Sequence, residues 1–393
     1  LGERKAVPFA TGVGGGYRLS ADRKKILFQT QAGGWNLADA DGAPPQAGAG
    51  ALNVAAIRML VDPKAEFRQM FDEGWRFQRD FLYVTNLHGA DYLKTKALYA
   101  PFVDHVRHRS DLVYLQDVLG GEVAVGHSFV FGGDLPAVPN ANSGLLGADY
   151  EIADSRYRIT KIYGSETWNP NVVGPLAGLG LGINVGDYLV AVNGVELTSR
   201  DNLDRLLEGT AGRQITITVN GRPSLEGARR VTVVPVRSEG ALRLYDWVEA
   251  NRRKVDQLSG GKVAYVYLPD TGEGGYTFFN RYFFAQQDRL GAVIDDRFNG
   301  GGSVADYIVD LLNRQLQGYF NNPVGDRQPF KTPVAGIWGP KVMLINESAG
   351  SGGDMLPYMF RQMKIGPLIG TKTWGGLVGI WDTPPLIDGG AML

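Results

Sequence analysis

The sequence predicts a multidomain α+β protein, and three observations support this fold class. The chain has 393 residues, which is long for one hydrophobic core, so two to four domains are expected. Alternating apolar residues indicate short strands near the N-terminal end, whereas three- and four-residue spacing indicates helices between about residues 52 and 120. After residue 242, strand-like and helix-like segments alternate, which is typical of a parallel or mixed sheet covered by helices.

The composition excludes several classes of protein. With 44% apolar and 21% charged residues the chain is an ordinary globular protein, and its formal net charge of −1 argues against a broad nucleic-acid-binding or polybasic membrane surface. No run of about 18 apolar residues predicts a membrane span. The absence of cysteine excludes disulfides, thiolate metal sites and cysteine nucleophiles. Because the first residue is leucine, we expect the natural N-terminus to lie upstream.

The first 150 residues divide into two predicted parts. Residues 17–42 contain short alternating runs separated by turn residues, and Leu19–Phe28 resembles the strand–turn–strand of a β-propeller blade, so residues 1–50 are expected to be the C-terminal piece of a propeller. Residues 51–150 are expected to form a helical subdomain, with a helical pattern that Pro63 interrupts. The segment AVGHSFVFGGD (124–134) then alternates like a strand.

Residues 155–238 contain short strand patterns and one helix-like piece. The order GPLAGLGLGINVGDYLVAVNGVELTSRDNLDRLLEG (174–209) resembles a PDZ domain of the type attached to bacterial and archaeal proteases. This resemblance implies a module that binds extended peptides by adding them to a sheet edge. A role as a spacer between catalytic parts is the alternative.

The last part, residues 242–393, has two glycine-rich turns that follow buried strands. The first is DDRFNGGGS (295–303) and the second is NESAGSGGD (346–354), which precedes a helix-like segment. Ligands of α/β sheets gather at the carboxyl ends of the strands. A strand-to-helix turn can aim a serine hydroxyl into a cleft while backbone N–H groups point at the same spot, as acyl-transfer chemistry requires. Taken alone, the second turn also fits a plain glycine-rich connection.

The order of four motifs along the chain resembles the tricorn protease family. The motifs are AVGHSFV (124–130), the FNGGG turn, NESAGSGGD and TKTWGG (371–376), with the PDZ-like segment after the first. The family's core belongs to the same clan as C-terminal processing peptidases. The resemblance implies an α/β core of the crotonase/ClpP type and a serine protease, without a cofactor or metal, that hydrolyses and trims oligopeptides. A non-catalytic scaffold that binds peptides at the PDZ edge is the alternative function.

The resemblance also implies roles for particular residues. Ser351 matches the nucleophile and is preferred to Ser348 because the family's serine follows Ala-Gly, and His127 matches the general base. The N–H of Gly352 and one N–H of the glycine turn match the oxyanion hole, where a residue without a Cβ lets the backbone approach the scissile carbonyl. The candidates in that turn are Gly300, Gly301 and Gly302.

Other charged residues are expected to act outside the proton transfers of catalysis. Asp326 is a candidate for binding basic substrate side chains, and Asp354 is expected to favour the helix dipole rather than to act as a base. Asp295 and Asp296 lack the partners of a metal site. The other histidines read as surface or turn residues: His88, His105 and His108.

The chain departs from its relatives at three places. Gly376 stands where C-terminal processing peptidases carry a catalytic lysine, and Gly126 stands where tricorn carries a serine before the histidine. The tetrad's glutamate has no counterpart before Leu393, so we expect the natural protein to continue beyond it and this chain to be poorly active. The family further implies a homo-oligomer, a hexamer, with peptide substrates and no nucleic-acid or membrane partner. A cytoplasmic location is expected, with a periplasmic one as the alternative.

Overall fold

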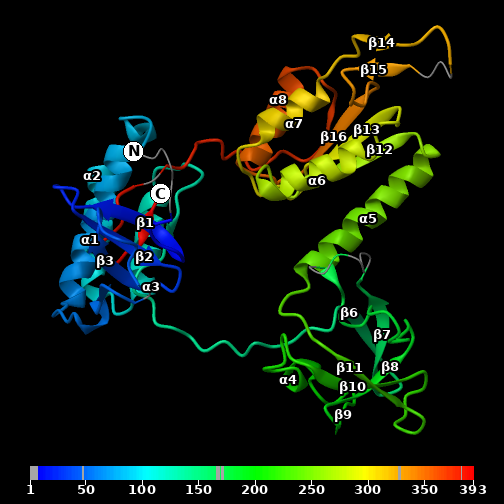
Figure 1. Ribbon diagram of the computed structural model, residues 1–393, viewed down its shortest axis with the longest axis horizontal. Coiled ribbons are helices and arrows are strands. Elements are labelled where there is room, and N and C mark those ends of the chain that lie inside the picture. Colours follow the sequence, from blue (N-terminus) through cyan, green and yellow to red (C-terminus); the bar gives the residue numbers. More distant parts are fainter. Residues whose placement is uncertain (1–7, 47, 165–168, 170–171, 326–328, 382) are drawn as a thin grey trace. The chain divides into compact units, whose positions relative to one another are not determined.

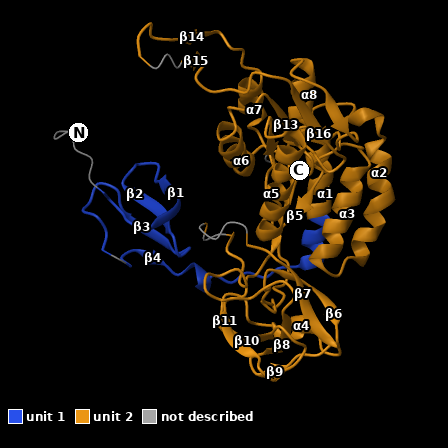
Figure 2. Ribbon diagram, turned by 90° about the vertical axis from the view of Figure 1, so that its right-hand side faces the viewer, with its two compact units in different colours: residues 1–69 blue, residues 70–393 orange. Residues whose placement is uncertain are grey.

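The computed structural model describes residues 8–46, 48–164, 169, 172–325, 329–381 and 383–393 (Figure 1). The chain separates into two compact units, residues 1–69 and 70–393, which Figure 2 colours separately. No helix in the described ranges is long and apolar enough to cross a membrane.

The first unit contains a four-stranded antiparallel sheet. Its strands follow one another in sequence order: β1 (Val13–Leu19), β2 (Lys25–Thr30), β3 (Trp35–Asp39) and β4 (Ala51–Leu52). The predicted alternation in residues 17–42 therefore forms paired strands, with Phe28 buried at the middle of the sheet. The described strands of this unit form this one sheet and do not show a β-propeller.

Three helices precede the PDZ-like region: α1 (Pro63–Phe81), α2 (Tyr92–Tyr99) and α3 (Arg109–Gly121). Pro63, which interrupts the helical pattern, is the first residue of α1, a position where its missing N–H costs nothing. The predicted strand of residues 124–134 shrinks to β5 (Val130–Phe131), which pairs with β18 (Ala391–Met392).

The PDZ-like region is an antiparallel sheet with the order β11-β10-β8-β7-β6, and β9 pairs with β8. The strands are β6 (Ala148–Ala153), β7 (Arg156–Ile162), β8 (Tyr188–Val192), β9 (Val195–Glu196), β10 (Ile215–Asn220) and β11 (Arg229–Val233). The short helix α4 (Leu203–Leu206) lies within the sequence predicted to be helical. Since β6 has one neighbour among the described strands, it is an edge of this sheet.

The last region contains a parallel sheet with the order β12-β13-β16-β17. Its strands are β12 (Val263–Tyr267), β13 (Gly291–Asp295), β16 (Lys341–Ile345) and β17 (Leu368–Gly370), and its helices are α5 (Gly240–Ser259), α6 (Glu273–Phe284), α7 (Ala305–Leu312) and α8 (Gly352–Gln362). Apolar side chains of these elements form one buried cluster, against which partly buried apolar side chains pack. A hairpin, β14 (Gly318–Phe320) with β15 (Phe330–Thr332), was not expected from the sequence.

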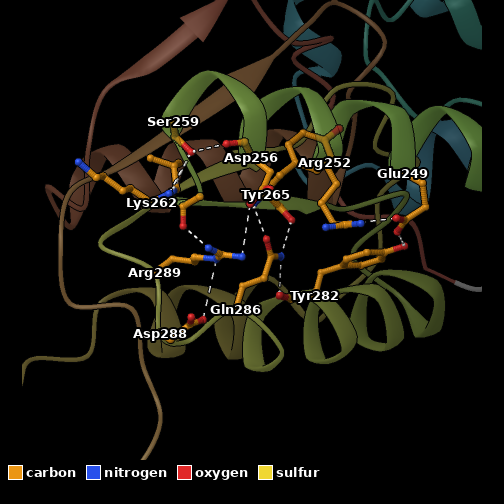
Figure 3. A network of polar contacts seen from close by, with 12 residues as sticks. Glu249, Arg252, Asp256, Ser259, Lys262, Tyr265, Tyr282, Gln286, Asp288 and Arg289 are labelled. Atoms are coloured by element: carbon orange, nitrogen blue, oxygen red, sulfur yellow. Dashed lines mark hydrogen bonds and ion pairs between the residues drawn. The ribbon is translucent and has the colours of Figure 1, made fainter.

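A buried glutamine completes the edge strand β12 (Figure 3). Gln286 accepts a hydrogen bond from the N–H of Tyr265 (3.2 Å) and donates to the carbonyl of the same residue (2.9 Å). It also donates to the carbonyl of Tyr282 (2.8 Å). The side chain thus makes both hydrogen bonds that a residue of a neighbouring strand would make, so the edge of β12 is satisfied at this point.

Candidate active site

The two glycine turns meet because β13 and β16 are parallel neighbours. Asp295 at the end of β13 lies opposite Leu344 of β16, so the carboxyl ends of both strands lie at the same edge of the sheet. The turn after β16 is anchored to the turn after β13 by a hydrogen bond from the N–H of Gly350 to the carbonyl of Asn299 (3.0 Å). The structure therefore brings together the two motifs that the sequence separates by about 50 residues.

Ser351 lies at a strained elbow between β16 and α8. Its φ is +58° and its ψ is −117°, and it is the residue immediately before the first residue of α8. A residue other than glycine adopts such a conformation only at a cost of about 1–3 kcal/mol, which surrounding contacts must offset. One such contact is the hydrogen bond from the Ser351 N–H to Asp354 Oδ2 (2.8 Å).

The FNGGG turn packs directly against this elbow. A Cβ added to Gly301 would lie 2.6 Å from Ser351 Cβ and 3.1 Å from Ser351 Oγ. A Cβ added to Gly352 would lie 2.3 Å from the carbonyl oxygen of Gly302 and 2.8 Å from its nitrogen. Both positions therefore require glycine, because any side chain would push the two turns apart.

The hydrogen bonds of the turn separate the three candidate glycines. The N–H of Gly300 donates to the carbonyl of Pro269 (2.9 Å), and the N–H of Gly301 donates to Asn299 Oδ1 (2.9 Å). Among the described residues, the N–H groups of Gly302 and Gly352 have no acceptor. These two groups, on residues that contact each other, are the ones left to bind an anion.

Thr271 is a residue of this site that the sequence did not reveal. Its N–H donates to the carbonyl of Gly301 (2.8 Å). Since the C=O and N–H of a trans peptide point in opposite directions, this bond turns the N–H of Gly302 away from Thr271. The side chain is fully buried, and within the described ranges its hydroxyl has no hydrogen-bond partner. A Cβ on Gly352 would lie 1.9 Å from this hydroxyl oxygen.

Asn299 and Asp296 form the buried support of the FNGGG turn. Both side chains are fully buried, and Asn299 Nδ2 donates to Asp296 Oδ1 (2.8 Å), which leaves Asn299 Oδ1 facing the N–H of Gly301. Burial raises the pKa of Asp296 well above its ordinary value, although the bond from Asn299 acts in the opposite direction. Asp296 therefore supports the turn from a fully buried position, through the hydrogen bond that it accepts from Asn299.

The TKTWGG segment is tied to the serine elbow from the other side. Asp354, 5% exposed, accepts hydrogen bonds from the N–H groups of Gly375 (2.7 Å) and Gly376 (3.0 Å) in addition to that of Ser351. The N–H of Trp374 donates to the carbonyl of Ala349 (2.9 Å). Asp354 thus joins two loops, because its two oxygens accept hydrogen bonds from three backbone N–H groups.

His127 reaches this assembly through Trp374. The two rings meet edge to face with centroids 5.2 Å apart, and a Cβ on Gly126 would lie 3.0 Å from the Cα of Gly376. His127 has a φ of +66°, so it lies in a tight left-handed turn rather than in the predicted strand. Its buried Nδ1 has no hydrogen-bond partner among the described residues, and no hydrogen bond links it to Ser351 there.

A pocket of about 470 Å³ opens beside His127. Its walls come from the end of α1 and from residues 377–381, and most are apolar, including Phe77, Phe81, Leu377 and Ile380. No acidic or basic side chain other than His127 lines it within the described residues. Asp326, the candidate for binding basic side chains, lies outside the described residues.

The remaining histidines have structural surroundings. His88 hydrogen-bonds the hydroxyl of Tyr83 (2.8 Å) and the carbonyl of Val123 (3.2 Å), and His108 caps the N-terminus of α3. His105 is exposed in a short 3₁₀ helix. The described residues contain no cluster of acidic and histidine side chains suited to a metal ion.

Comparisons with known proteins agree with this arrangement. Residues 63–119 match the model of the tricorn protease C1 domain, residues 144–238 that of the tricorn protease PDZ domain, and residues 262–393 that of peptidase family S41. Tricorn protease homolog 1 of Streptomyces coelicolor is 36% identical over 342 residues, which cover 86% of this chain and 31% of that protein. Tricorn protease of Thermoplasma volcanium is 30% identical over 373 residues, which cover 95% of this chain and 36% of that protein.

A crystal structure of tricorn protease superimposes on the chain with a TM-score of 0.89 at 28% identity, covering 100% of this chain and 37% of that one. The chain thus spans about a third of the length of the relatives it matches. With its C1, PDZ and S41 peptidase domains in that order, the chain belongs to the tricorn protease family.

Proposed function

We propose that this chain carries a serine peptidase site that hydrolyses and trims oligopeptides. The observation that carries the proposal is the elbow at Ser351, where the N–H groups of Gly302 and Gly352 have no acceptor among the described residues and the FNGGG turn touches the serine side chain. A nucleophile next to two free N–H donors at the start of a helix suits the attack on a carbonyl group and the stabilisation of the resulting oxyanion.

The proposed reaction follows from these positions. Ser351 Oγ attacks the scissile carbonyl carbon while His127 takes the hydroxyl proton, and His127 then returns the proton to the leaving amine. The N–H groups of Gly302 and Gly352 donate to the tetrahedral oxyanion. A water molecule then attacks the acyl-enzyme while His127 takes its proton, and His127 returns this proton to Ser351 Oγ as the acid product leaves. Within this scheme Asp354 and Thr271 position backbone groups and do not touch the substrate.

One observation favours the second candidate, a scaffold that binds peptides without cleaving them. The buried Nδ1 of His127 has no partner in the described part of the chain. A histidine base works best when its second nitrogen donates to a partner that fixes the tautomer and stabilises the imidazolium. The scaffold would use the free edge of β6, which is present whether or not Ser351 reacts.

Covalent labelling distinguishes the two candidates. A fluorophosphonate probe should label the chain at Ser351, and Ser351→Ala should abolish both labelling and the hydrolysis of fluorogenic peptides. Loss of a serine nucleophile lowers kcat by about 10⁶-fold. Ser348→Ala is the matched control, because Ser348 is an exposed serine of the same turn. Labelling that persists in Ser351→Ala and disappears in Ser348→Ala would reassign the nucleophile, and no labelling of the unchanged chain would favour the scaffold.

The family resemblance supports four wider proposals. We propose that residues 1–50 are a blade of a β-propeller, since β1 to β4 form a four-stranded antiparallel sheet. The remaining domains are proposed to be a helical domain (residues 51–150), a PDZ domain (155–238) and a peptidase domain (242–393). We further propose that the protein forms a homo-oligomer, which light scattering tests. The last proposal is a cytoplasmic location, which cell fractionation tests.

A further inference from the structure

A groove of about 560 Å³ lies between β6 and α4 in the PDZ domain. The groove is lined by apolar residues, Leu146, Ala148 of β6, Leu203 of α4 and Leu207, and by charged residues that include Arg200, Asp201 and Asp204. β6 is an edge strand among the described strands, and its residues Ala148 and Tyr150 line this groove. An extended peptide laid here would continue the sheet and insert alternate side chains between β6 and α4.

One end of the groove is the turn through which the chain enters β6. The backbone N–H groups at such a turn would hold the carboxylate of a peptide that ends in the groove. Here the N–H of Leu145 donates to the carbonyl of Val236 (2.8 Å). The N–H of Gly147 donates to Oε1 of Glu239 (2.7 Å). A carboxylate is therefore already bound at this turn, and it belongs to the chain itself.

The Glu239 carboxylate is firmly held. Glu239 is only 9% exposed and lies at the N-cap of α5. Its Oε2 accepts from Arg243 Nε (2.9 Å) and Nη2 (2.6 Å), one helical turn away. Arg243 is itself fixed by Asp149 Oδ1 (2.8 Å) and the hydroxyl of Tyr163 (2.8 Å). Both Glu239 oxygens have donors, so the side chain needs no further ligand at this position.

We infer that Glu239 acts as a built-in ligand of the β6–α4 groove, so that the groove selects extended peptide segments without a free terminal carboxylate. A peptide that ends at Gly147 would bring a second carboxylate against Glu239, and like charges in contact disfavour binding strongly. An internal or amidated segment passes the same place without this repulsion. The groove therefore suits segments within a longer polypeptide rather than its C-terminus. This inference goes beyond the proposed hydrolysis and does not depend on Ser351 being reactive.

The test compares two fluorescein-labelled peptides of the same extended apolar sequence, one ending in a carboxylate and one in an amide. Binding is measured by fluorescence anisotropy on the full chain with Ser351→Ala, so that no turnover occurs. We expect the amide to bind at least about tenfold more tightly, a ratio that corresponds to 1.4 kcal/mol. Glu239→Gln keeps an acceptor for the N–H of Gly147 and removes the negative charge beside it, while Asp149 and Tyr163 still hold Arg243, so it should abolish or reverse this preference. Glu239→Ala should shift the ratio in the same direction.

Glu208→Gln is the matched control, because Glu208 is exposed near α4 and does not line the groove. It should leave the ratio unchanged, and thermal melts establish that each variant is folded. Equal binding of the two peptides to the unchanged groove, or tighter binding of the carboxylate peptide, would overturn the inference even if the Glu239 variants did not fold. So would failure of both peptides to bind, or a ratio that folded Glu239 variants leave unchanged. None of these results bears on Ser351, whose reactivity is measured by fluorophosphonate labelling.

Discussion

Replacing Gly352 by alanine tests the proposed oxyanion hole most directly. The new Cβ would lie 1.9 Å from Thr271 Oγ1 and 2.3 Å from the carbonyl oxygen of Gly302, whereas such contacts are essentially never shorter than 3.0 Å. The two turns must therefore separate by about 1 Å, and a misplacement of 1 Å can lower a rate by about 10²-fold. Loss of one oxyanion donor lowers kcat by about 10²–10³-fold.

We therefore expect Gly352→Ala to lower kcat for a fluorogenic peptide by at least about 10²-fold. Overpacking of this kind also costs about 1–3 kcal/mol of stability, so urea unfolding must show that the variant is folded under the assay conditions. The rate of fluorophosphonate labelling should fall together with kcat, because the labelling reaction places a developing negative charge on an oxygen at the same position.

The matched control lies in the opposing turn. A Cβ on Gly300 would be 3.8 Å from the nearest atom, the carbonyl oxygen of Pro269, and the N–H of this residue is already donated to that oxygen. Gly300→Ala should therefore keep kcat within a few-fold of the unchanged chain. Comparable losses in Gly300→Ala and Gly352→Ala, or full activity in Gly352→Ala, would refute the assignment of Gly302 and Gly352 as the donors.

Three further substitutions test the base and the supports of the site. His127→Ala should lower kcat by about 10⁴-fold or more, as loss of a catalytic histidine does, whereas His105→Ala should not change it; equal effects would remove His127 from the mechanism. Burial raises the pKa of Asp296 in the folded protein. The protonated carboxyl therefore contributes fully to stability below its pKa in the unfolded chain, about 3.9, and this contribution is lost as the pH rises toward its pKa in the folded protein. Relative to Asp296→Asn, the unchanged chain should lose about 1.4 kcal/mol of unfolding free energy per pH unit in that window, measured by urea unfolding, and a pH-independent difference would contradict this. Gln286→Leu leaves the N–H and C=O of β12 unpaired and should cost about 1–3 kcal/mol for each group, whereas Gln315→Leu at an exposed position should be nearly neutral in the same measurement.

Local patterns in the sequence predicted much of the fold. Apolar residues make up most of β12, β13 and β16, and the turns after β13 and β16 are rich in glycine. These patterns predict that both turns lie at the carboxyl edge of a parallel or mixed sheet, and the strand order agrees. The strand predicted over residues 124–134 shrinks to the two residues of β5, whose partner among the described strands is the distant β18. β6, which pairs with the next strand β7, was not predicted from the sequence.

The site was predictable only to the level of motifs. Three glycines in a row indicate a close backbone approach, but which N–H remains free depends on the acceptors that Pro269 and Asn299 supply. Thr271 carries no signal in the sequence because an isolated threonine before a glycine-rich helix start is common. The link that Asp354 makes to the TKTWGG loop likewise needs the fold, since the two segments are about 20 residues apart and meet through backbone N–H groups.

The absence of a lysine at position 376 has a physical reason in this structure. A Cβ on Gly376 would lie 2.2 Å from an atom of the Trp374 ring, so no side chain fits at that position while the ring keeps its place. The same ring lies against Gly350 of the serine elbow. It also meets the His127 ring edge to face, with the two ring centroids 5.2 Å apart. Trp374 thus occupies the space that a side chain at position 376 would need, and it packs against the histidine that we propose as the base. Glycine at position 126 is part of the same arrangement, because a Cβ added there would lie 3.0 Å from the Cα of Gly376 and 3.3 Å from the Trp374 ring, so its neighbours would have to shift.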